Sequence, residues 1–155
     1  MTSFPPCPAP FNLAAHALLQ AGAQPDKSAL QILRPQGAER WSYGRLEAAV
    51  RGCGTGLLAR GLQPGDRVLM RLGNTPAFPV LFLGAIAAGL VPVPTSSALT
   101  APEATRLATR IAPALIVAED GVALPDHPAP VIGAAEVLAM ERLAPCAWEM
   151  GDPDR

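Results

Sequence analysis

Three groups of residues in this sequence have side chains or spacings that could do chemistry. Residues 52–56, GCGTG, are rich enough in glycine to suggest a dinucleotide-binding loop. Residues 95–100, TSSALT, offer several hydroxyl groups to a phosphate, and Glu119 and Asp120 are adjacent carboxylates after an apolar run. Each group also has an ordinary structural explanation, and the surrounding sequence decides between the two.

The glycine-rich run does not have the spacing of a dinucleotide fingerprint. That fingerprint is Gly-x-Gly-x-x-Gly on a turn between a strand and a helix, whereas Leu46, Val50, Cys53 and Leu57 form the apolar stripe of a helix through this run. Glycine in a helix costs about 1 kcal/mol relative to alanine, so we interpret these glycines as sites of close helix packing. A nucleotide-binding oxidoreductase has no other support in the sequence.

The hydroxyl-rich run lacks both features of a phosphate-binding loop. Such a loop needs glycines that expose backbone N–H groups, and usually a lysine that meets the phosphate charge. Residues 95–100 contain neither, and Lys27, the only lysine of the chain, precedes the first predicted strand. We therefore interpret the run as a loop whose Thr100 caps the following helix.

The other titratable side chains form no catalytic or metal-binding group in the sequence. His16 lies in a predicted helix and His127 in a loop, and neither has a nucleophile beside it or a second ligand at metal spacing. Glu119 and Asp120 follow a strand, at the end where ligands lie in open α/β sheets, but adjacent acids in a turn are more often solvated. Asp66 closes a Pro-Gly turn. We assign no catalytic, cofactor-binding or metal-ligating residue.

Composition indicates an apolar globular chain of one domain. Of the 155 residues, 50% are hydrophobic and 16% are charged, with a net charge of −1. These values exclude a disordered tail and give no electrostatic footprint for nucleic acid or an anionic membrane surface. Cys7, Cys53 and Cys146 have neither metal nor redox spacing, and their odd number argues against a disulfide framework. We expect a reduced, cytoplasmic setting.

Neither a targeting segment nor a membrane span is predicted. Residues 1–10 contain four prolines and no basic residue, which is not the pattern of a signal peptide. The most apolar stretch, residues 78–94, is interrupted by prolines and glycines and is shorter than the roughly 20 residues that a membrane helix needs.

The hydrophobic pattern predicts an α/β fold in which strands and helices alternate. The expected elements are a helix capped by Asn12 and ended by Gly22, a hairpin over 28–42, a helix from Ser42 to Gly61, strands over 68–72, 90–93 and 114–118, helices over 76–88 and 102–111 between them, and a last helix over 134–143. Because this alternation requires crossover connections, we expect a partial doubly wound, mainly parallel sheet with flanking helices and an N-terminal hairpin. Pro92 and Pro94 predict that their strand is short. Residues 11–155 form one domain after a proline-rich segment at 1–10.

A series of motifs in fixed order gives the sequence a specific resemblance. They are Trp41-Ser42-Tyr43 with Leu46, RGL at 60–62, PGDRV at 64–68, GNTPAF at 73–78, FLGA at 82–85, AGLVPVP at 88–94, and then Leu99, Thr100 and Glu103. In this order the chain resembles the N-terminal region of the AMP-forming acyl-CoA synthetases, members of the adenylate-forming superfamily. Residues 73–100 look most like members that activate aromatic acids such as benzoate. The resemblance implies the N-terminal subdomain of that fold.

The resemblance also implies a two-step reaction of a whole enzyme. ATP and a carboxylic acid form an acyl-adenylate and pyrophosphate, and CoA then displaces AMP to give a thioester. The family uses a phosphate loop with a lysine, an acidic magnesium ligand, a ribose-binding aspartate and a lysine of a C-terminal domain, and we find none of them here. Because the phosphate loop normally comes shortly after the position of Arg155, we expect an inactive fragment that itself binds no ATP, Mg²⁺ or CoA. Ala98 stands where several CoA ligases carry a basic residue near the CoA channel.

A stand-alone binding or interaction module is the alternative to a ligase fragment. Residues 78–88 are apolar on more sides than so short a chain is expected to cover, and a truncated sheet has an open edge. The fragment hypothesis therefore predicts that the isolated chain self-associates through the sheet edge or the apolar face. No nucleic-acid partner is expected.

Overall fold

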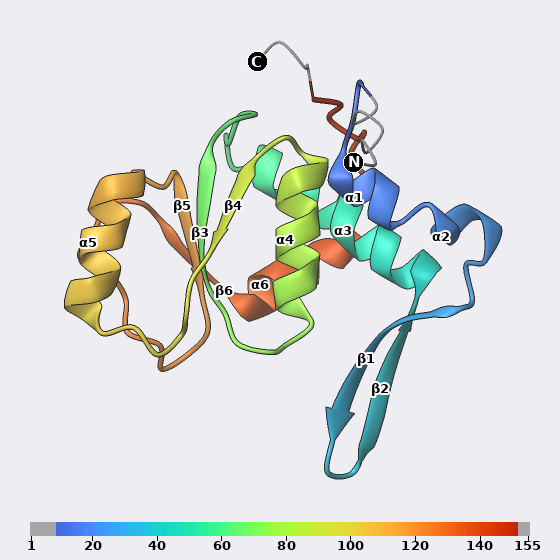
Figure 1. Ribbon diagram of the computed structural model, residues 1–155, viewed down its shortest axis with the longest axis horizontal. Coiled ribbons are helices and arrows are strands. Elements are labelled where there is room, and N and C mark those ends of the chain that lie inside the picture. Colours follow the sequence, from blue (N-terminus) through green and yellow to red (C-terminus); the bar gives the residue numbers. More distant parts are fainter. Residues whose placement is uncertain (1–8, 152–155) are drawn as a thin grey trace, which may run out of the picture.

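Two β-sheets organise the part of the chain that the computed structural model describes, residues 9–151 (Figure 1). Residues 1–8 of the proline-rich segment, including Cys7, lie outside it. An antiparallel hairpin consists of β1 (Ser28–Arg34) and β2 (Gly37–Ser42). A parallel sheet has the order β4-β3-β5-β6, with β3 (Arg67–Arg71), β4 (Val91–Pro94), β5 (Leu115–Ala118) and β6 (Val131–Gly133). The predicted α/β class, parallel sheet and N-terminal hairpin are confirmed.

Helices cover both faces of the parallel sheet, as expected for a doubly wound fold. α5 (Ala101–Ile111) lies on one face, and α3 (Tyr43–Leu58), α4 (Ala77–Ala87) and α6 (Ala134–Ala139) lie on the other (Figure 1). Because strand side chains alternate between faces, Leu69 packs toward α5 while Val68 and Met70 join the larger core under α3 and α4. The hairpin projects away from this body.

The edge strand β4 accommodates its two prolines without losing a hydrogen bond to the sheet. The Val91 N–H donates to the Asp66 carbonyl at 2.8 Å, and the Thr95 N–H donates to the Met70 carbonyl at 3.0 Å. This alternation turns the nitrogens of Pro92 and Pro94 away from β3, where no partner strand needs a donor. As the sequence predicted, the strand is short, and it ends at Pro94.

Two expectations about helices are corrected. The first helix is divided into α1 (Leu13–Ala17) and α2 (Gln20–Ala23), and Gly22 lies within α2 instead of ending a single helix. The division allows α1 to pack on α4 while α2 packs on α3. The last α-helix, α6, ends at Ala139 and is followed by a single 3-10 turn over Met140–Arg142. This tighter turn packs the buried Met140 side chain against Gly56.

Strand β6 was not predicted, and its brevity is the reason. It has three residues and follows a proline-rich loop, so it offers no alternation that could be read from the sequence. Its pairing with β5 makes it the edge of the sheet opposite β4. Val131 on this edge is 46% exposed.

Asn12 caps α1 as predicted and also fastens distant segments together. Its Oδ1 accepts hydrogen bonds from the Ala14 and Ala15 N–H groups, at 2.9 and 3.1 Å. Its Nδ2 donates to the carbonyl of Ile86 in α4 and to that of Glu149, at 2.8 and 2.7 Å. One buried amide therefore joins the first helix, the end of α4 and the C-terminal segment.

The glycines of α3 allow neighbouring chain segments to approach its backbone. A Cβ at Gly52 or Gly56 would collide with residues of the 140–143 turn, and one at Gly54 would lie 2.6 Å from Cys146 Sγ. On the facing helix, a Cβ at Gly84 would lie 2.8 Å from Cys53 Cβ and 2.9 Å from the Val50 carbonyl oxygen. Residues 52–56 are therefore packing positions within a helix, which confirms the structural interpretation and excludes the dinucleotide loop.

Helix α4 is covered more completely than the sequence suggested. It packs on α1, α3, α6 and β4, so that every one of its residues is buried or half-buried. Phe78 and Phe82 are half-buried and stack with their ring centroids 6.3 Å apart. The expectation that this chain could not cover the apolar helix is met only in part, because Pro79, Leu83 and Ile86 are half-buried as well and no residue of the helix is fully exposed.

Substituting Gly84 tests the close contact between α3 and α4. We expect Gly84→Ala to lower the free energy of unfolding by about 1–3 kcal/mol, because the added methyl group meets Cys53 and backbone that cannot move freely. Urea denaturation followed by circular dichroism measures the change. The matched control is Gly22→Ala in α2, where nothing lies within 4 Å of the new Cβ. Equal stability of the two variants would contradict close packing at Gly84.

Candidate functional site

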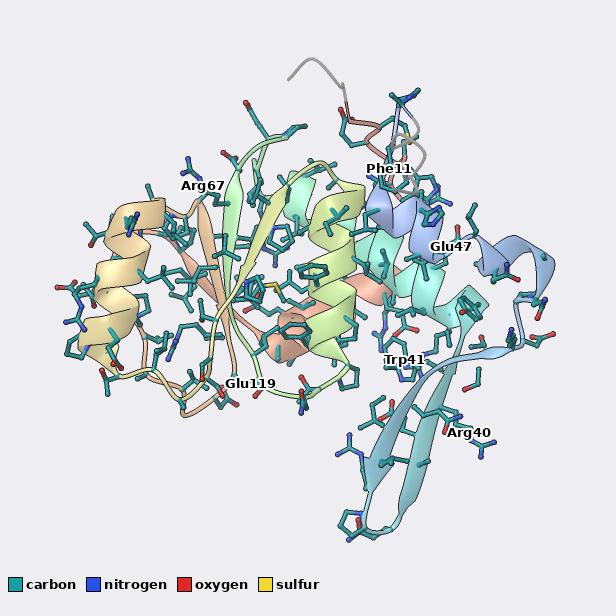
Figure 2. All side chains as sticks on the ribbon, viewed as in Figure 1. Phe11, Arg40, Trp41, Glu47, Arg67 and Glu119 are labelled. Atoms are coloured by element: carbon teal, nitrogen blue, oxygen red, sulfur yellow. The ribbon has the colours of Figure 1, made fainter. Side chains whose placement is uncertain are left out.

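A cleft of about 530 Å³ opens at the carboxyl ends of β3, β5 and β6. Thr75 and Pro76 line it after β3, Glu119 and Asp120 line it after β5, and Gly133 lines it at the end of β6. Glu119 lies at the opposite end of the sheet from Arg67, the first residue of β3 (Figure 2). Carboxyl ends of parallel strands are where ligands bind in open α/β sheets.

Glu119 and Asp120 have different environments, although they are adjacent in sequence. The Thr75 hydroxyl donates a hydrogen bond to Glu119 Oε1 at 2.8 Å, and the half-buried Glu119 side chain folds over Gly73. Asp120 is exposed, as expected for a solvated turn. The sequence analysis had favoured a solvated Glu119. In the structure its hydrogen bond with Thr75 instead connects the loop after β3 to the loop after β5.

The other wall of the cleft is an ionic network that runs along the hairpin strands to α3 and Glu141. The Trp41 indole N–H donates to Glu39 Oε1 at 2.7 Å, and Arg34 lies 3.4 Å from the other oxygen of that carboxylate. Arg45 stacks 3.7 Å from the Trp41 ring centroid and bonds to Glu141 at 3.1 Å. The hydrogen bond from Trp41, followed by the nearby guanidinium groups, lowers the pKa of Glu39.

The remaining sequence candidates lie outside the cleft and have structural roles. Thr100 begins α5, where its N–H donates to the Glu103 carboxylate at 2.8 Å, and this bond lowers the pKa of Glu103. His16 is exposed beside Phe11, and His127 Nδ1 accepts from the Ala129 N–H at 3.1 Å. Asp66 closes its turn by accepting from the Gln63 N–H at 2.8 Å, as predicted.

Arg71 is the charged residue that sequence reasoning missed. It is the last residue of β3 and is 0% exposed, with its guanidinium among the loops at the carboxyl end of the sheet. Burial lowers its pKa, although an arginine stays charged. The available signal was a single charge inside the apolar run of residues 68–72, which predicts a buried cation with dedicated partners.

Two of the cysteines lie near the contact between α3 and the C-terminal segment, and both are free thiols. Burial raises the pKa of the Cys53 thiol to about 12 and also raises the pKa of Cys146. Since the thiolate is the nucleophile, neither group is activated for covalent catalysis.

The polar side chains that line the cleft bind one another and support the surrounding loops. Its arginines are paired with carboxylates, and its Thr75 hydroxyl donates to Glu119; among residues 9–151, no Ser, Cys, His or Lys side chain lines it. The same described residues hold no group of three or more His, Cys, Asp or Glu side chains that could bind a metal ion. Within that range, no helix has both the length and the apolar character to cross a membrane.

The raised pKa of Cys53 predicts slow alkylation in the folded protein. At pH 8 a thiol of pKa about 12 is roughly 10⁻⁴ ionised, so iodoacetamide should modify Cys53 about a thousandfold more slowly than an ordinary thiol. Peptide mapping by mass spectrometry after timed labelling measures the rate. In guanidinium chloride Cys53 should react as fast as Cys146. Rapid labelling of Cys53 in the native protein would show that the helix contact is not closed.

Comparisons with known proteins agree with the resemblance seen in the sequence. The 4-hydroxybenzoate–CoA/benzoate–CoA ligase of Rhodopseudomonas palustris is 34% identical over an alignment 119 residues long, which covers 65% of this chain and 22% of that ligase. The crystal structure of a benzoate CoA ligase from Burkholderia xenovorans LB400 superposes with a TM-score of 0.77 at 27% identity, over 91% of this chain and 31% of that one. The chain thus spans less than a third of the length of either protein.

The fold also matches a solved N-terminal subdomain. The N-terminal subdomain of NpsA from Klebsiella oxytoca superposes with a TM-score of 0.77 over 92% of this chain and 36% of that one, and its 16% identity shows the fold alone. Finally, the sequence profile described as "AMP-binding enzyme" matches residues 19–149. The chain therefore belongs to the AMP-binding enzyme family of adenylate-forming ligases.

Proposed function

We propose that the whole protein is an AMP-forming acid–CoA ligase and that this chain is its N-terminal α/β subdomain. The whole protein activates a carboxylic acid with ATP to an acyl-adenylate and transfers the acyl group to CoA. Within it, residues 1–10 form a proline-rich lead and residues 11–155 form a scaffold without activity of its own. We expect this protein to act in the cytoplasm, because the proposed reaction uses ATP and CoA.

The family match over residues 19–149 is the observation that carries this proposal. It extends over both the hairpin and the parallel sheet, so the similarity covers an architecture and not a single motif. Among the acids that such ligases activate, we propose an aromatic carboxylate, because the sequence and structure comparisons both include benzoate–CoA ligases.

The described residues do not fit a binding site for ATP, Mg²⁺ or CoA. Lys27, the only lysine of the sequence, is exposed and does not line the cleft. The cleft arginines Arg34 and Arg45 are engaged by Glu39 and Glu141, and no metal-ligand group occurs in the described range. We therefore assign ATP, magnesium and CoA binding to parts of the protein outside these 155 residues and route no chemical step through this chain.

In this proposal, the chain contributes the carboxyl end of the parallel sheet as a rigid support. Trp41 is 2% exposed and fixes the base of the hairpin, while the Thr75–Glu119 bond holds the loops after β3 and β5. These contacts give the cleft one fixed wall. In the proposed enzyme, the wall supports the substrate-binding parts without touching the reacting atoms.

The test is acid-dependent ATP–pyrophosphate exchange by the protein expressed from the complete reading frame that contains these residues. We expect exchange with benzoate or 4-hydroxybenzoate, and a CoA thioester detectable by mass spectrometry. Residues 1–155 expressed alone are expected to give neither product, because we assign no catalytic group to this chain. A long-chain fatty acid serves as the comparison substrate.

Each other outcome of this test changes a different part of the proposal. Exchange by residues 1–155 alone overturns the scaffold role. Exchange without thioester in the complete protein overturns CoA as the acceptor, a result for which Ala98 offers an explanation. A reading frame that stops after Arg155, or a complete protein that exchanges with no acid, overturns the ligase in favour of a binding module.

A further inference from the structure

Arg71 makes an unusual set of contacts for a buried charge. Among residues 9–151, its guanidinium donates hydrogen bonds to backbone carbonyls and to no carboxylate. Nε bonds to Ala123 at 2.8 Å, Nη1 to Ser96 at 3.1 Å, and Nη2 to Leu99 at 2.9 Å and Ser97 at 3.5 Å. A buried cation without a counter-ion is costly, so these carbonyl dipoles are what stabilise it there.

The four acceptors belong to two loops that are far apart in sequence. Residues 95–100 connect β4 to α5, and residues 119–130 connect β5 to β6. Both loops leave the carboxyl ends of strands that flank β3, the strand that carries Arg71. One planar group therefore contacts both loops from a position between them.

We propose that Arg71 is a positioning residue that couples these two loops, so that they are ordered together and released together. The reason is geometric, because the guanidinium is a rigid fork and cannot satisfy one loop independently of the other. If the 119–130 loop leaves, the Nε–H loses its acceptor in a buried position. Moving the group to find water withdraws Nη1 and Nη2 from the 95–100 loop.

The coupling reaches the walls of the cleft. Glu119 and Asp120 begin the second loop, and the Glu119 N–H donates to the Arg71 carbonyl at 3.2 Å. The first loop adds a bond of its own to the same strand, since the Thr95 hydroxyl donates to the Met70 carbonyl at 2.9 Å. A ligand or a neighbouring domain that displaces one loop is therefore expected to mobilise the other.

Hydrogen exchange measured by mass spectrometry tests this inference in the protein expressed from its complete reading frame. In Arg71→Met, whose side chain has a similar length but no donor, we expect exchange to become at least tenfold faster in both segments 95–100 and 119–124. Exchange over β3 and β5 should change no more than global stability requires. Acceleration of one loop alone would overturn the coupling.

Leu69→Ala is the matched control, because Leu69 is fully buried on the same face of the same strand. It removes apolar contacts with α5 and leaves the guanidinium bonds in place, so it should destabilise the protein without selective release of the two loops. If Leu69→Ala accelerates both loops as much as Arg71→Met does, Arg71 acts only through general stability and the proposal fails.

Two further measurements keep the inference testable if Arg71→Met does not fold. In the unmodified protein, exchange in rising denaturant should show the two loops following one common opening curve, and separate curves would overturn the coupling. Arg71→Lys keeps the charge but loses the fork, so we expect exchange in both loops to be faster than in the unmodified protein. Full protection of both loops in Arg71→Lys would show that charge alone suffices and would overturn the argument from the fork.

Discussion

The close approach of α3 to its neighbours is the constraint on which the rest of the structure depends. Three glycines in α3 and one in α4 remove the side chains that would separate these backbones. The helix propensity lost at each glycine, about 1 kcal/mol, is offset by apolar contacts that a wider separation would not allow. Through this contact α3 holds α4 against the sheet and receives the 140–143 turn on its other side.

The same packing explains how the C-terminal segment is held without regular secondary structure. After the 3-10 turn, Thr55 donates to the Ala144 carbonyl at 2.6 Å and Arg51 Nε donates to that of Cys146 at 2.8 Å. Arg51 also lies 5.1 Å from the Trp148 ring centroid. Side chains of α3 therefore satisfy carbonyls that a strand or helix would otherwise pair.

The sequence predicted those elements that have a strong local signal. Local patterns were sufficient to predict α3, the Asn12 and Ser42 helix caps and the alternating order of strands and helices. Each of these patterns depends on residues close together in the chain. Strand β6 and the divided first helix could not be predicted, since they are decided by contacts between distant segments. The resemblance to the AMP-forming acyl-CoA synthetases then assigned these elements together to the N-terminal subdomain of one fold.

Prediction of the candidate site was less complete for a related physical reason. Glu119 and Asp120 were correctly expected at the carboxyl end of the sheet, but nothing local links Glu119 to Thr75, 44 residues away. The network around Glu39 likewise joins the hairpin to Arg45 and Glu141 across the fold. Such bonds depend on tertiary geometry, whereas a lone arginine in an apolar strand such as Arg71 is a signal that sequence analysis can use.

The two ends of the parallel sheet differ in what the chain places there. Near the amino end, Asn12 joins α1 to Glu149, and the Gly151 N–H donates to the Phe11 carbonyl at 3.1 Å. At the carboxyl end, the loops are held by Arg71 and Glu119, and the cleft is open. Polar bonds therefore bring the first and last described segments together at one end of the sheet, and the cleft lies at the other. This asymmetry is what a scaffold requires if it is to present one fixed wall to the rest of an enzyme.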